Sequence, residues 1–204
     1  MSKRYRDSIS LQIFLAFWLK HAPIENFHKQ WAREHAKQIS AKRQQVLYDS
    51  GTPEKCIYFV CKGMIALIEI NGENRRIIKS IAAPFNALKT TSHLHSDTPR
   101  SGKIVALRAS KVLRIAYSSI NKMKEMDPLI ARLVNILVNK KMRQQDAHIA
   151  VILHKSVTER VRHFRLELNQ LALLMTQQEQ ADYLGISRRA LQKSLYALLT
   201  SKSK

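Results

Sequence analysis

Residues Thr176–Leu199, with the sequence TQQEQADYLGISRRALQKSLYALL, carry the signals of two helices joined by a sharp turn. Thr176 opens the pattern Thr-Gln-Gln-Glu, a capping box that favours a helix start, and Gly185 can adopt the left-handed conformation that ends a helix. Ser187 is a good N-cap for a second helix. Ala181 is small where the two helices must approach each other. Together these features predict a helix-turn-helix.

The second predicted helix separates apolar and polar side chains onto opposite faces. At about 100° per residue, its leucines fall within one arc, and basic and amide side chains fall on the opposite arc. Arg and Lys can donate to guanine O6 and N7, and Gln can pair with adenine N6 and N7. Helix N-termini and their capping hydroxyls can hold phosphates. The sequence therefore predicts that seven residues contact DNA: Thr176, Ser187, Arg188, Arg189, Gln192, Lys193 and Tyr196. The alternative is that they form an ordinary solvated basic face.

The composition agrees with a polyanionic partner. Among 204 residues, 35 are Lys or Arg and 15 are Asp or Glu, which gives a formal net charge of +20. Such a chain favours nucleic acid or an anionic membrane surface as its partner. No stretch approaches the roughly 18 consecutive apolar residues that a membrane-spanning helix needs. The two cysteines, Cys56 and Cys61, cannot form a disulfide framework and fit a reducing cytosol. We expect a cytoplasmic protein with no membrane partner.

Residues 46–117 have the pattern of a series of short strands. Apolar segments such as Cys56–Cys61 and Met64–Ile70 alternate with turn signals. Asn71 and Gly72, which follow the second segment, are typical of a two-residue hairpin turn because both tolerate positive φ. Several short strands of this kind predict an antiparallel barrel or sandwich.

Helical patterns flank these strands. Within residues 1–45, large side chains recur every four residues, the spacing of a helical stripe: Phe27, Trp31, His35 and Ile39. Further along, Asp127 is a good N-cap and Pro128 suits the first helical position, which predicts the start of a long helix of about 25 residues. A helix of that length often packs against a copy of itself. A helix of an intramolecular bundle is the alternative.

The order of these segments resembles that of the Crp/Fnr family of bacterial transcription regulators. Gly51–Gly63 is similar to the β-roll pattern of the family, Pro99–Leu107 to the end of its phosphate-binding cassette, and Thr158–Arg162 to the helix that enters its DNA-binding domain. The resemblance extends over about residues 36–199. It implies an α+β fold: an antiparallel β-roll (double-stranded β-helix) as a sensor-like domain, a long dimerisation helix and a C-terminal helix-turn-helix.

The resemblance also implies a domain plan and a set of partners. We expect an N-terminal helical lead and a cyclic-nucleotide-binding-like β-roll domain at 1–125, a long dimerisation helix and linker at 126–154, and a DNA-binding domain at 155–204. The family normally continues into a β wing after the recognition helix. Because this sequence ends at Lys204, we expect that wing to be short or absent. The expected partners are double-stranded DNA and a second copy of the chain, with RNA polymerase as a candidate.

Carried over residue by residue, the base-reading positions of the family fall on Arg188, Arg189 and Lys193. The second of these positions is often acidic in the family and pairs with cytosine, so Arg189 predicts a different target sequence. A dimeric reader would bind a near-palindrome, with its two recognition helices about 34 Å apart.

The resemblance also marks a candidate effector pocket formed by Thr90, Thr91, Arg100 and Ser101. In ligand-binding relatives, a Gly-Glu pair precedes an Arg-Ser pair; the Glu accepts from a ribose hydroxyl and the Arg meets the cyclic phosphate. Here Thr90 and Thr91 stand at the Gly-Glu positions, and a neutral Thr is a weaker acceptor than a carboxylate. We therefore expect a degenerate pocket and no cofactor, with cyclic nucleotide binding as the alternative.

Other chemistries have little support in the sequence. The two cysteines are too few for an iron–sulfur cluster, and His93 and His95 without nearby acids or thiols make a weak metal site. We recognise no paired carboxylates, nucleophile–base pair or Gly-rich phosphate loop, so we predict no metal site and no enzyme. The alternative function is a non-specific nucleic-acid-binding or compaction protein, which the high charge and the missing wing would favour.

Overall fold

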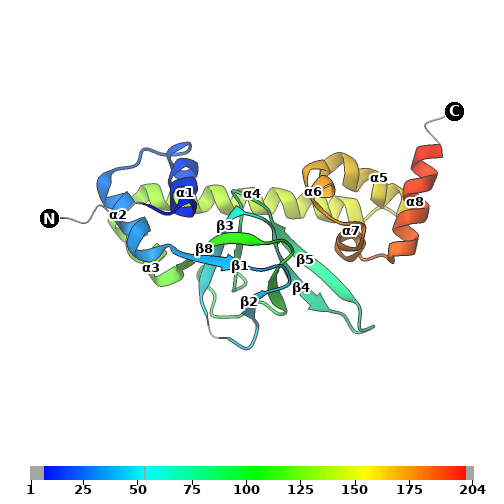
Figure 1. Ribbon diagram of the computed structural model, residues 1–204, viewed down its shortest axis with the longest axis horizontal. Coiled ribbons are helices and arrows are strands. Elements are labelled where there is room, and N and C mark those ends of the chain that lie inside the picture. Colours follow the sequence, from blue (N-terminus) through cyan, green and yellow to red (C-terminus); the bar gives the residue numbers. More distant parts are fainter. Residues whose placement is uncertain (1–6, 53, 201–204) are drawn as a thin grey trace. The chain divides into compact units, whose positions relative to one another are not determined.

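A computed structural model describes residues 7–52 and 54–200. By its internal contacts the chain divides into two compact units: the roll unit, Met1–Leu67 with Ile81–Val138, and the C-terminal unit, Ile68–Ser80 with Asn139–Lys204. The elements drawn in Figure 1 follow the order α1 (Ile9–Leu19), α2 (Asn26–His35), β1 (Lys37–Ala41), β2 (Val46–Asp49), β3 (Cys56–Lys62), β4 (Ile65–Ile70), β5 (Arg76–Ala82), β6 (Ala87–Lys89), β7 (Lys103–Ala106), β8 (Ser110–Ala116), α3 (Tyr117–Met126), α4 (Pro128–Ile152), α5 (Val157–Glu167), α6 (Asn169–Leu174), α7 (Gln177–Leu184) and α8 (Arg188–Thr200).

The strands of the described chain form two four-stranded sheets, in the orders β1-β8-β3-β6 and β2-β7-β4-β5. The strand pairs β1–β8, β2–β7, β3–β6 and β3–β8 are antiparallel. β3 lies inside the first sheet, where Tyr58 is opposite Leu88 of β6 on one side and Arg114 of β8 on the other. The predicted antiparallel β-roll and the α+β fold are therefore confirmed.

β3 is buried on both faces because its alternating side chains enter two different cores. Ile57 and Phe59 pack into the core that also contains α1, where the rings of Phe59 and Phe14 meet edge to face with centroids 5.1 Å apart. Tyr58 and Val60 belong to the second core, in the interior of the roll. This double burial explains why the strand is an uninterrupted apolar segment in the sequence rather than an alternating one.

The turn from β3 into β4 requires glycine. Gly63 has φ of +88°, in the left-handed region. A Cβ at this position would lie 2.3 Å from Ser110 Oγ and 2.6 Å from the carbonyl oxygen of Ala109. No side chain can be placed there without moving the neighbouring backbone.

The prediction that the helical stripe extends to Ile39 is wrong. α2 stops at His35, Ala36 is extended, and β1 begins at Lys37. Ile39 pairs with Val112 of β8. A four-residue spacing is also a multiple of the two-residue period of a strand, so the position of Ile39 satisfies both patterns. Pairing with β8, which is distant in the sequence, decides between them.

The hairpin turn between β4 and β5 is longer than the predicted two residues. The N–H of Asn71 donates to the carbonyl oxygen of Arg75 at 2.9 Å, and the left-handed residue is Asn74, with φ of 57°, rather than Gly72. Asn71 Oδ1 accepts from the backbone N–H groups of Glu73 and Arg75. This side chain thus closes a wider loop than an Asn-Gly turn would form.

α4 begins as predicted and is 25 residues long. Oδ1 of Asp127 accepts from the Leu129 N–H at 2.9 Å. Oδ2 of Asp127 contacts Nε2 of His28, a fully buried side chain on α2, whose Nδ1 accepts from the Glu25 N–H. The cap of α4 is thereby tied to α2. Among the described residues, neither α4 nor any other helix is long and apolar enough to cross a membrane.

Candidate nucleic-acid interface

α7 begins behind the predicted capping box, which is confirmed. Thr176 Oγ1 accepts from the Glu179 N–H at 3.3 Å, and Glu179 Oε2 accepts from the Thr176 N–H at 2.8 Å. Glu179 is buried, whereas Thr176 and Gln177 are exposed. The start of α7 therefore offers backbone N–H groups and a hydroxyl at the surface, an arrangement that suits a phosphate.

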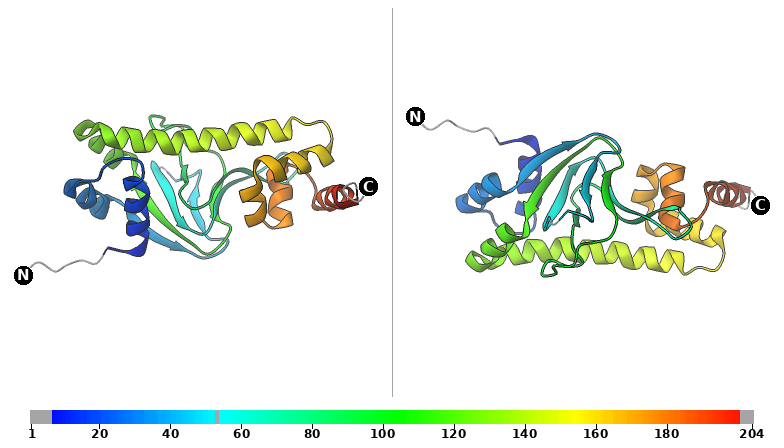
Figure 2. Two further views of the ribbon diagram at one scale, coloured as in Figure 1. Left: turned by 90° about the horizontal axis from the view of Figure 1, so that it is seen from above. Right: turned by 90° about the horizontal axis from the view of Figure 1, so that it is seen from below.

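The turn between α7 and α8, the orange and red helices of Figure 2, also agrees with the sequence prediction. Gly185 ends α7 in the left-handed conformation, with φ of 65°. Ala181 is fully buried, and its carbonyl oxygen accepts from the N–H groups of Gly185 and Ile186. Ser187 Oγ accepts from the Ala190 N–H at 3.1 Å, which caps α8. Local hydrogen bonds thus set the angle at which α8 leaves the turn.

The inner face of α8 is anchored within the C-terminal unit. Leu191 is fully buried, and Leu195 and Leu198 are half-buried. Ser194 is buried as well, and its Oγ accepts from Thr158 Oγ1 of α5 at 3.3 Å. Burying a leucine side chain is worth roughly 1.5–3 kcal/mol, so this face holds α8 firmly.

The outer face of α8 carries cationic, amide and phenol groups. The helix contains no Asp or Glu, so no acid on α8 neutralises its cations. The structure places all seven predicted contact residues at the surface, two at the helix starts and five along α8: Thr176, Ser187, Arg188, Arg189, Gln192, Lys193 and Tyr196.

One residue of this surface was missed in the sequence. Gln177, the first residue of α7, lies beside α8, and its Oε1 accepts from Nε2 of Gln192 at 3.1 Å. The two residues are fifteen positions apart, so no helical spacing relates them. The only sequence signal was the place of Gln177 next to the predicted cap at Thr176.

Two residues of α7 connect it to other parts of the C-terminal unit. The carbonyl oxygen of Tyr183 accepts from Nε2 of His148 on α4 at 2.8 Å. Asp182 is buried, accepts from Gln178 Nε2 at 2.8 Å and pairs with Arg76 Nε of β5 at 3.4 Å. α7 is therefore held from two sides by polar contacts.

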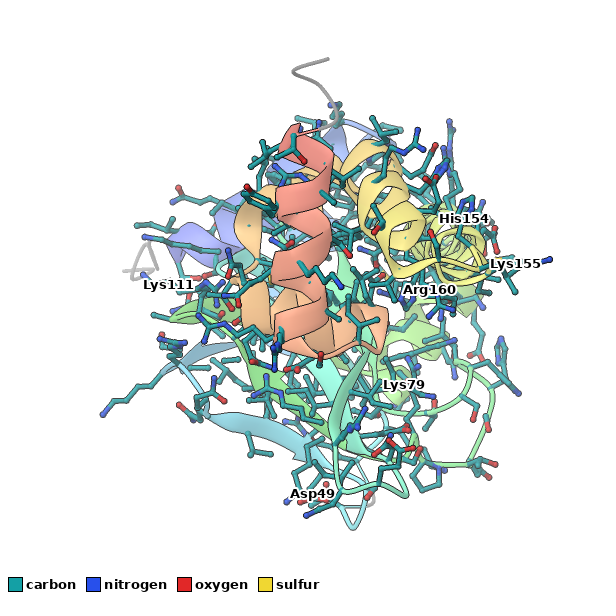
Figure 3. The ribbon with its side chains drawn as sticks, turned by 90° about the vertical axis from the view of Figure 1, so that its right-hand side faces the viewer. Asp49, Lys79, Lys111, His154, Lys155 and Arg160 are labelled. Atoms are coloured by element: carbon teal, nitrogen blue, oxygen red, sulfur yellow. The ribbon has the colours of Figure 1, made fainter. Side chains whose placement is uncertain are left out.

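The junction of α4 and α5 brings basic side chains together. His154, Lys155 and Arg160 lie close to one another there (Figure 3), and Arg160 Nε donates to the His154 carbonyl oxygen at 2.7 Å. The rings of His154 and His163 stack with centroids 3.9 Å apart. Positive charge in the C-terminal unit is thus not restricted to α8.

The residues of the predicted effector pocket lie in the roll unit, and the structure brings three of the four together. The Arg100 N–H donates to the carbonyl oxygen of Thr90 at 2.8 Å. Thr91 forms a bridge with Pro99, which directly precedes Arg100. Ser101 continues the chain at the surface.

Known proteins share the sequence pattern and the fold of this chain. Residues 38–127 match the family model of the cyclic nucleotide-binding domain. The nitrogen fixation regulation protein FixK of Azorhizobium caulinodans is 22% identical over 203 residues, covering 86% of this chain and 80% of that protein. FixK2 from Bradyrhizobium japonicum has a similar structure, with a TM-score of 0.69, 22% identity and coverage of 82% of this chain and 86% of that chain.

A putative transcriptional regulator of the Crp/Fnr family from Eubacterium rectale gives a TM-score of 0.67 at 16% identity, over 87% of this chain and 85% of that chain. The chain is therefore similar in sequence and fold to regulators of the Crp/Fnr family. The resemblance first identified from the segments between residues 36 and 199 is therefore confirmed, and the relatives named here are regulators.

The match of residues 38–127 to the cyclic nucleotide-binding domain makes a cyclic nucleotide a candidate ligand, and the contacts of the pocket residues bear on it. Thr90 is fully buried; its Oγ1 accepts from the Cys56 N–H and donates to the Glu54 carbonyl oxygen. Thr91 is also buried, and its Oγ1 bonds to Tyr117 Oη and to the carbonyl oxygen of His93. Both hydroxyls serve the protein itself, so neither supplies the acceptor that a ribose would need.

Tyrosine side chains occupy the interior of the roll beside these residues. Tyr48 Oη donates to the Arg100 carbonyl oxygen at 3.0 Å, and Tyr58 Oη bonds to the Leu47 carbonyl oxygen at 2.7 Å. Burial raises the pKa of both phenols above the ordinary value. Burial, together with the charge of Arg100, lowers the pKa of Lys89. The phenol groups of Tyr48 and Tyr58 are thus bonded to backbone carbonyl groups of the roll itself.

Proposed function

We propose that the chain is a dimeric, sequence-specific DNA-binding transcription regulator of the Crp/Fnr type. The observation that carries this proposal is the outer face of α8, on which five exposed side chains offer hydrogen-bond donors and none is acidic. Leu191 and Ser194 fix the opposite face in the C-terminal unit. A rigid helix with one free, cationic face is what a major groove can accommodate.

Five of the exposed residues have stated roles in this proposal. Arg189 and Lys193 donate to guanine O6 and N7, and Gln192 pairs with adenine N6 and N7. Thr176 and Ser187, at the starts of α7 and α8, contact phosphates that set the register. An acidic residue at this position would accept a hydrogen bond from cytosine. Arg189 donates hydrogen bonds instead, so it selects a purine.

The proposed dimer forms through α4. Met142 and Ile149 are exposed on this helix and lie seven residues apart, which is the repeat of a coiled-coil seam. Ile152 and Leu153, at the end of the helix, are also exposed. A second copy of α4 would cover these side chains and place two α8 helices on a near-palindromic site.

The proposed regulator holds no cyclic nucleotide in its roll. The internal hydrogen bonds of Thr90 and Thr91, and the tyrosines beside Arg100, support a degenerate pocket. RNA polymerase remains a candidate partner, and we propose no enzymatic role.

Selection from randomised duplex DNA, followed by gel shifts, tests the proposal. The full chain should enrich one near-palindromic motif, and Arg189→Ala or Lys193→Ala should each lose about 1–3 kcal/mol of discrimination at one position of each half-site. Lys122→Ala removes the same charge from an exposed site on α3 and should leave the motif unchanged. Unchanged base preference in both α8 variants would overturn the assignment of α8 as the recognition helix.

Non-specific nucleic-acid binding is the second candidate, and the net charge of +20 favours it. Both functions predict affinity that falls steeply with salt, because phosphate contacts release counterions. The two differ in the selection experiment. A compaction protein would bind every duplex alike and enrich no motif.

A further inference from the structure

We propose that Gln177 is a positioning residue that fixes the amide of Gln192 for reading adenine. This inference rests on the proposed function of α8. It concerns a residue on α7 that touches no base and acts through its hydrogen bond to Gln192. The inference therefore assigns part of the sequence specificity to the first residue of the helix before the recognition helix.

The backbones of both glutamines are held in place. Gln177 directly follows Thr176, whose capping box with buried Glu179 fixes the first turn of α7. Gln192 follows Leu191, which is fully buried. Their side chains, by contrast, are both exposed. Because the backbones are fixed, only the side-chain amides of Gln177 and Gln192 are left free to rotate. The hydrogen bond from Gln192 Nε2 to Gln177 Oε1, at 3.1 Å, restricts both.

The direction of the bond determines what Gln192 can read. A glutamine amide has a donor end and an acceptor end, and turning it over exchanges them. Gln177 Oε1 accepts from Nε2 of Gln192, so the nitrogen end is turned to α7. Nε2 keeps a second N–H, and Oε1 keeps its acceptor sites. Those groups match adenine N7, an acceptor, and adenine N6, a donor.

Without Gln177, the Gln192 amide could rotate freely in water. A Gln192 amide that is turned over would present its donor and acceptor to adenine in the reverse order. Restricting its rotamers on DNA binding would also cost conformational entropy, which would weaken the complex. A pre-oriented group avoids that cost, as in other preorganised interfaces. Removal of Gln177 should therefore weaken the preference for adenine rather than the binding to phosphates.

The test measures base preference, position by position, with the full chain and randomised duplexes. Gln192→Ala should abolish the preference for adenine at one position of each half-site. Gln177→Leu, which keeps the size of the side chain, should reduce that preference about three- to tenfold, the range of one hydrogen bond. The double variant Q177L/Q192A should lose no more than Gln192→Ala alone, because one residue acts through the other.

Two further variants separate the positioning role of Gln177 from an effect of charge and from an effect on the structure of α7. Gln177→Glu keeps an acceptor for Nε2 of Gln192, so it should retain the adenine preference while its negative charge weakens binding to all duplexes. Gln178→Leu removes an amide from the same turn of α7, one that bonds Asp182 rather than α8. This matched control should leave the preference unchanged.

The outcomes distinguish this inference from the function on which it rests. If the unaltered chain enriches no motif, the proposed function itself is overturned. If a motif appears and depends on Arg189 and Lys193, but Gln177→Leu leaves the preference at the Gln192 position intact, the positioning role is wrong and the regulator stands. Equal loss in Gln178→Leu, or additive loss in the double variant, would also overturn it.

Discussion

The imidazole ring of His148 on α4 lies nearly parallel to the phenol ring of Tyr183 on α7, with centroids 3.8 Å apart and an interplanar angle of 10°. Nε2 of His148 also donates to the carbonyl oxygen of the same tyrosine. A single side chain thus stacks on the helix-turn-helix and bonds its backbone. The Tyr183 ring in turn packs against Phe164 of α5. We therefore expect the stability of the C-terminal unit to depend on the protonation of His148.

Acidification should destabilise the C-terminal unit through His148. Burial lowers the pKa of this imidazole, and the charges of Lys141 and Lys79 lower it further, against the opposing effect of the Tyr183 carbonyl. In the unfolded chain, His148 has a pKa near 6.5 and binds a proton more readily than in the folded state. The contribution of the neutral imidazole to stability is therefore complete above pH 6.5 and is lost as the pH falls below that value. Hydrogen exchange of α7 amides at a series of pH values measures this loss.

His148→Phe keeps a ring for stacking and removes the titration. Its C-terminal unit should be less stable at neutral pH, because a hydrogen bond is lost, yet should vary less with pH than the unaltered chain. His93→Gln, at an exposed histidine of the roll unit, is the matched control and should keep the original pH profile. Identical profiles in His148→Phe and the unaltered chain would show that His148 is not the titrating group.

Asp182→Ala should cost about 2 kcal/mol of unfolding free energy, because a buried carboxylate that satisfies two partners is removed. Gln178 would lose its acceptor, and the half-buried guanidinium of Arg76 would lose its counter-charge. Urea unfolding measures the change. Gln178→Ala removes only one of these contacts and should cost clearly less; equal costs would mean that the pair with Arg76 contributes nothing.

Gly185→Ala should cost about 1 kcal/mol, because an L-residue is strained at positive φ. The surroundings leave room for a Cβ, so the penalty is one of backbone conformation alone. Asn tolerates this region better than Ala, and Gly185→Asn should recover part of the loss. Gly72→Ala, also in open space but without a positive φ, should change the melting temperature little. Equal effects at the two glycines would refute the strain argument.

Cyclic AMP in large excess should leave the melting temperature unchanged. A ligand present at 100 times its dissociation constant would stabilise the folded state by about 2.7 kcal/mol, which thermal unfolding detects easily. The internal bonding of Thr90 and Thr91 is the reason to expect no shift. A stabilisation that Arg100→Ala removes would show instead that the pocket is functional.

The helix-turn-helix could be predicted from the sequence because its signals are local. The bonds that cap α7 at Thr176 and α8 at Ser187 span only three residues, and the conformation of Gly185 belongs to one residue. Such features depend little on the rest of the fold. The exposure of Arg189 and Lys193 also followed from helical periodicity alone.

The parts that could not be predicted depend on distant partners. Ile39 is in a strand because β8, more than seventy positions away, pairs with it. Gln177 and Gln192 meet only after the turn has formed, and His148 meets Tyr183 across 35 residues. No periodic pattern in one segment contains that information, since each contact arises from tertiary packing.

Both tryptophans of the chain, Trp18 and Trp31, belong to the buried core of the roll unit. Tryptophan emission therefore reports on that unit, and the unit that carries α8 contains no tryptophan. A single indole introduced at Tyr196, which is 72% exposed, would make that unit visible by itself. The difference in emission between this variant and the unaltered chain would then follow the arrival of a duplex at α8.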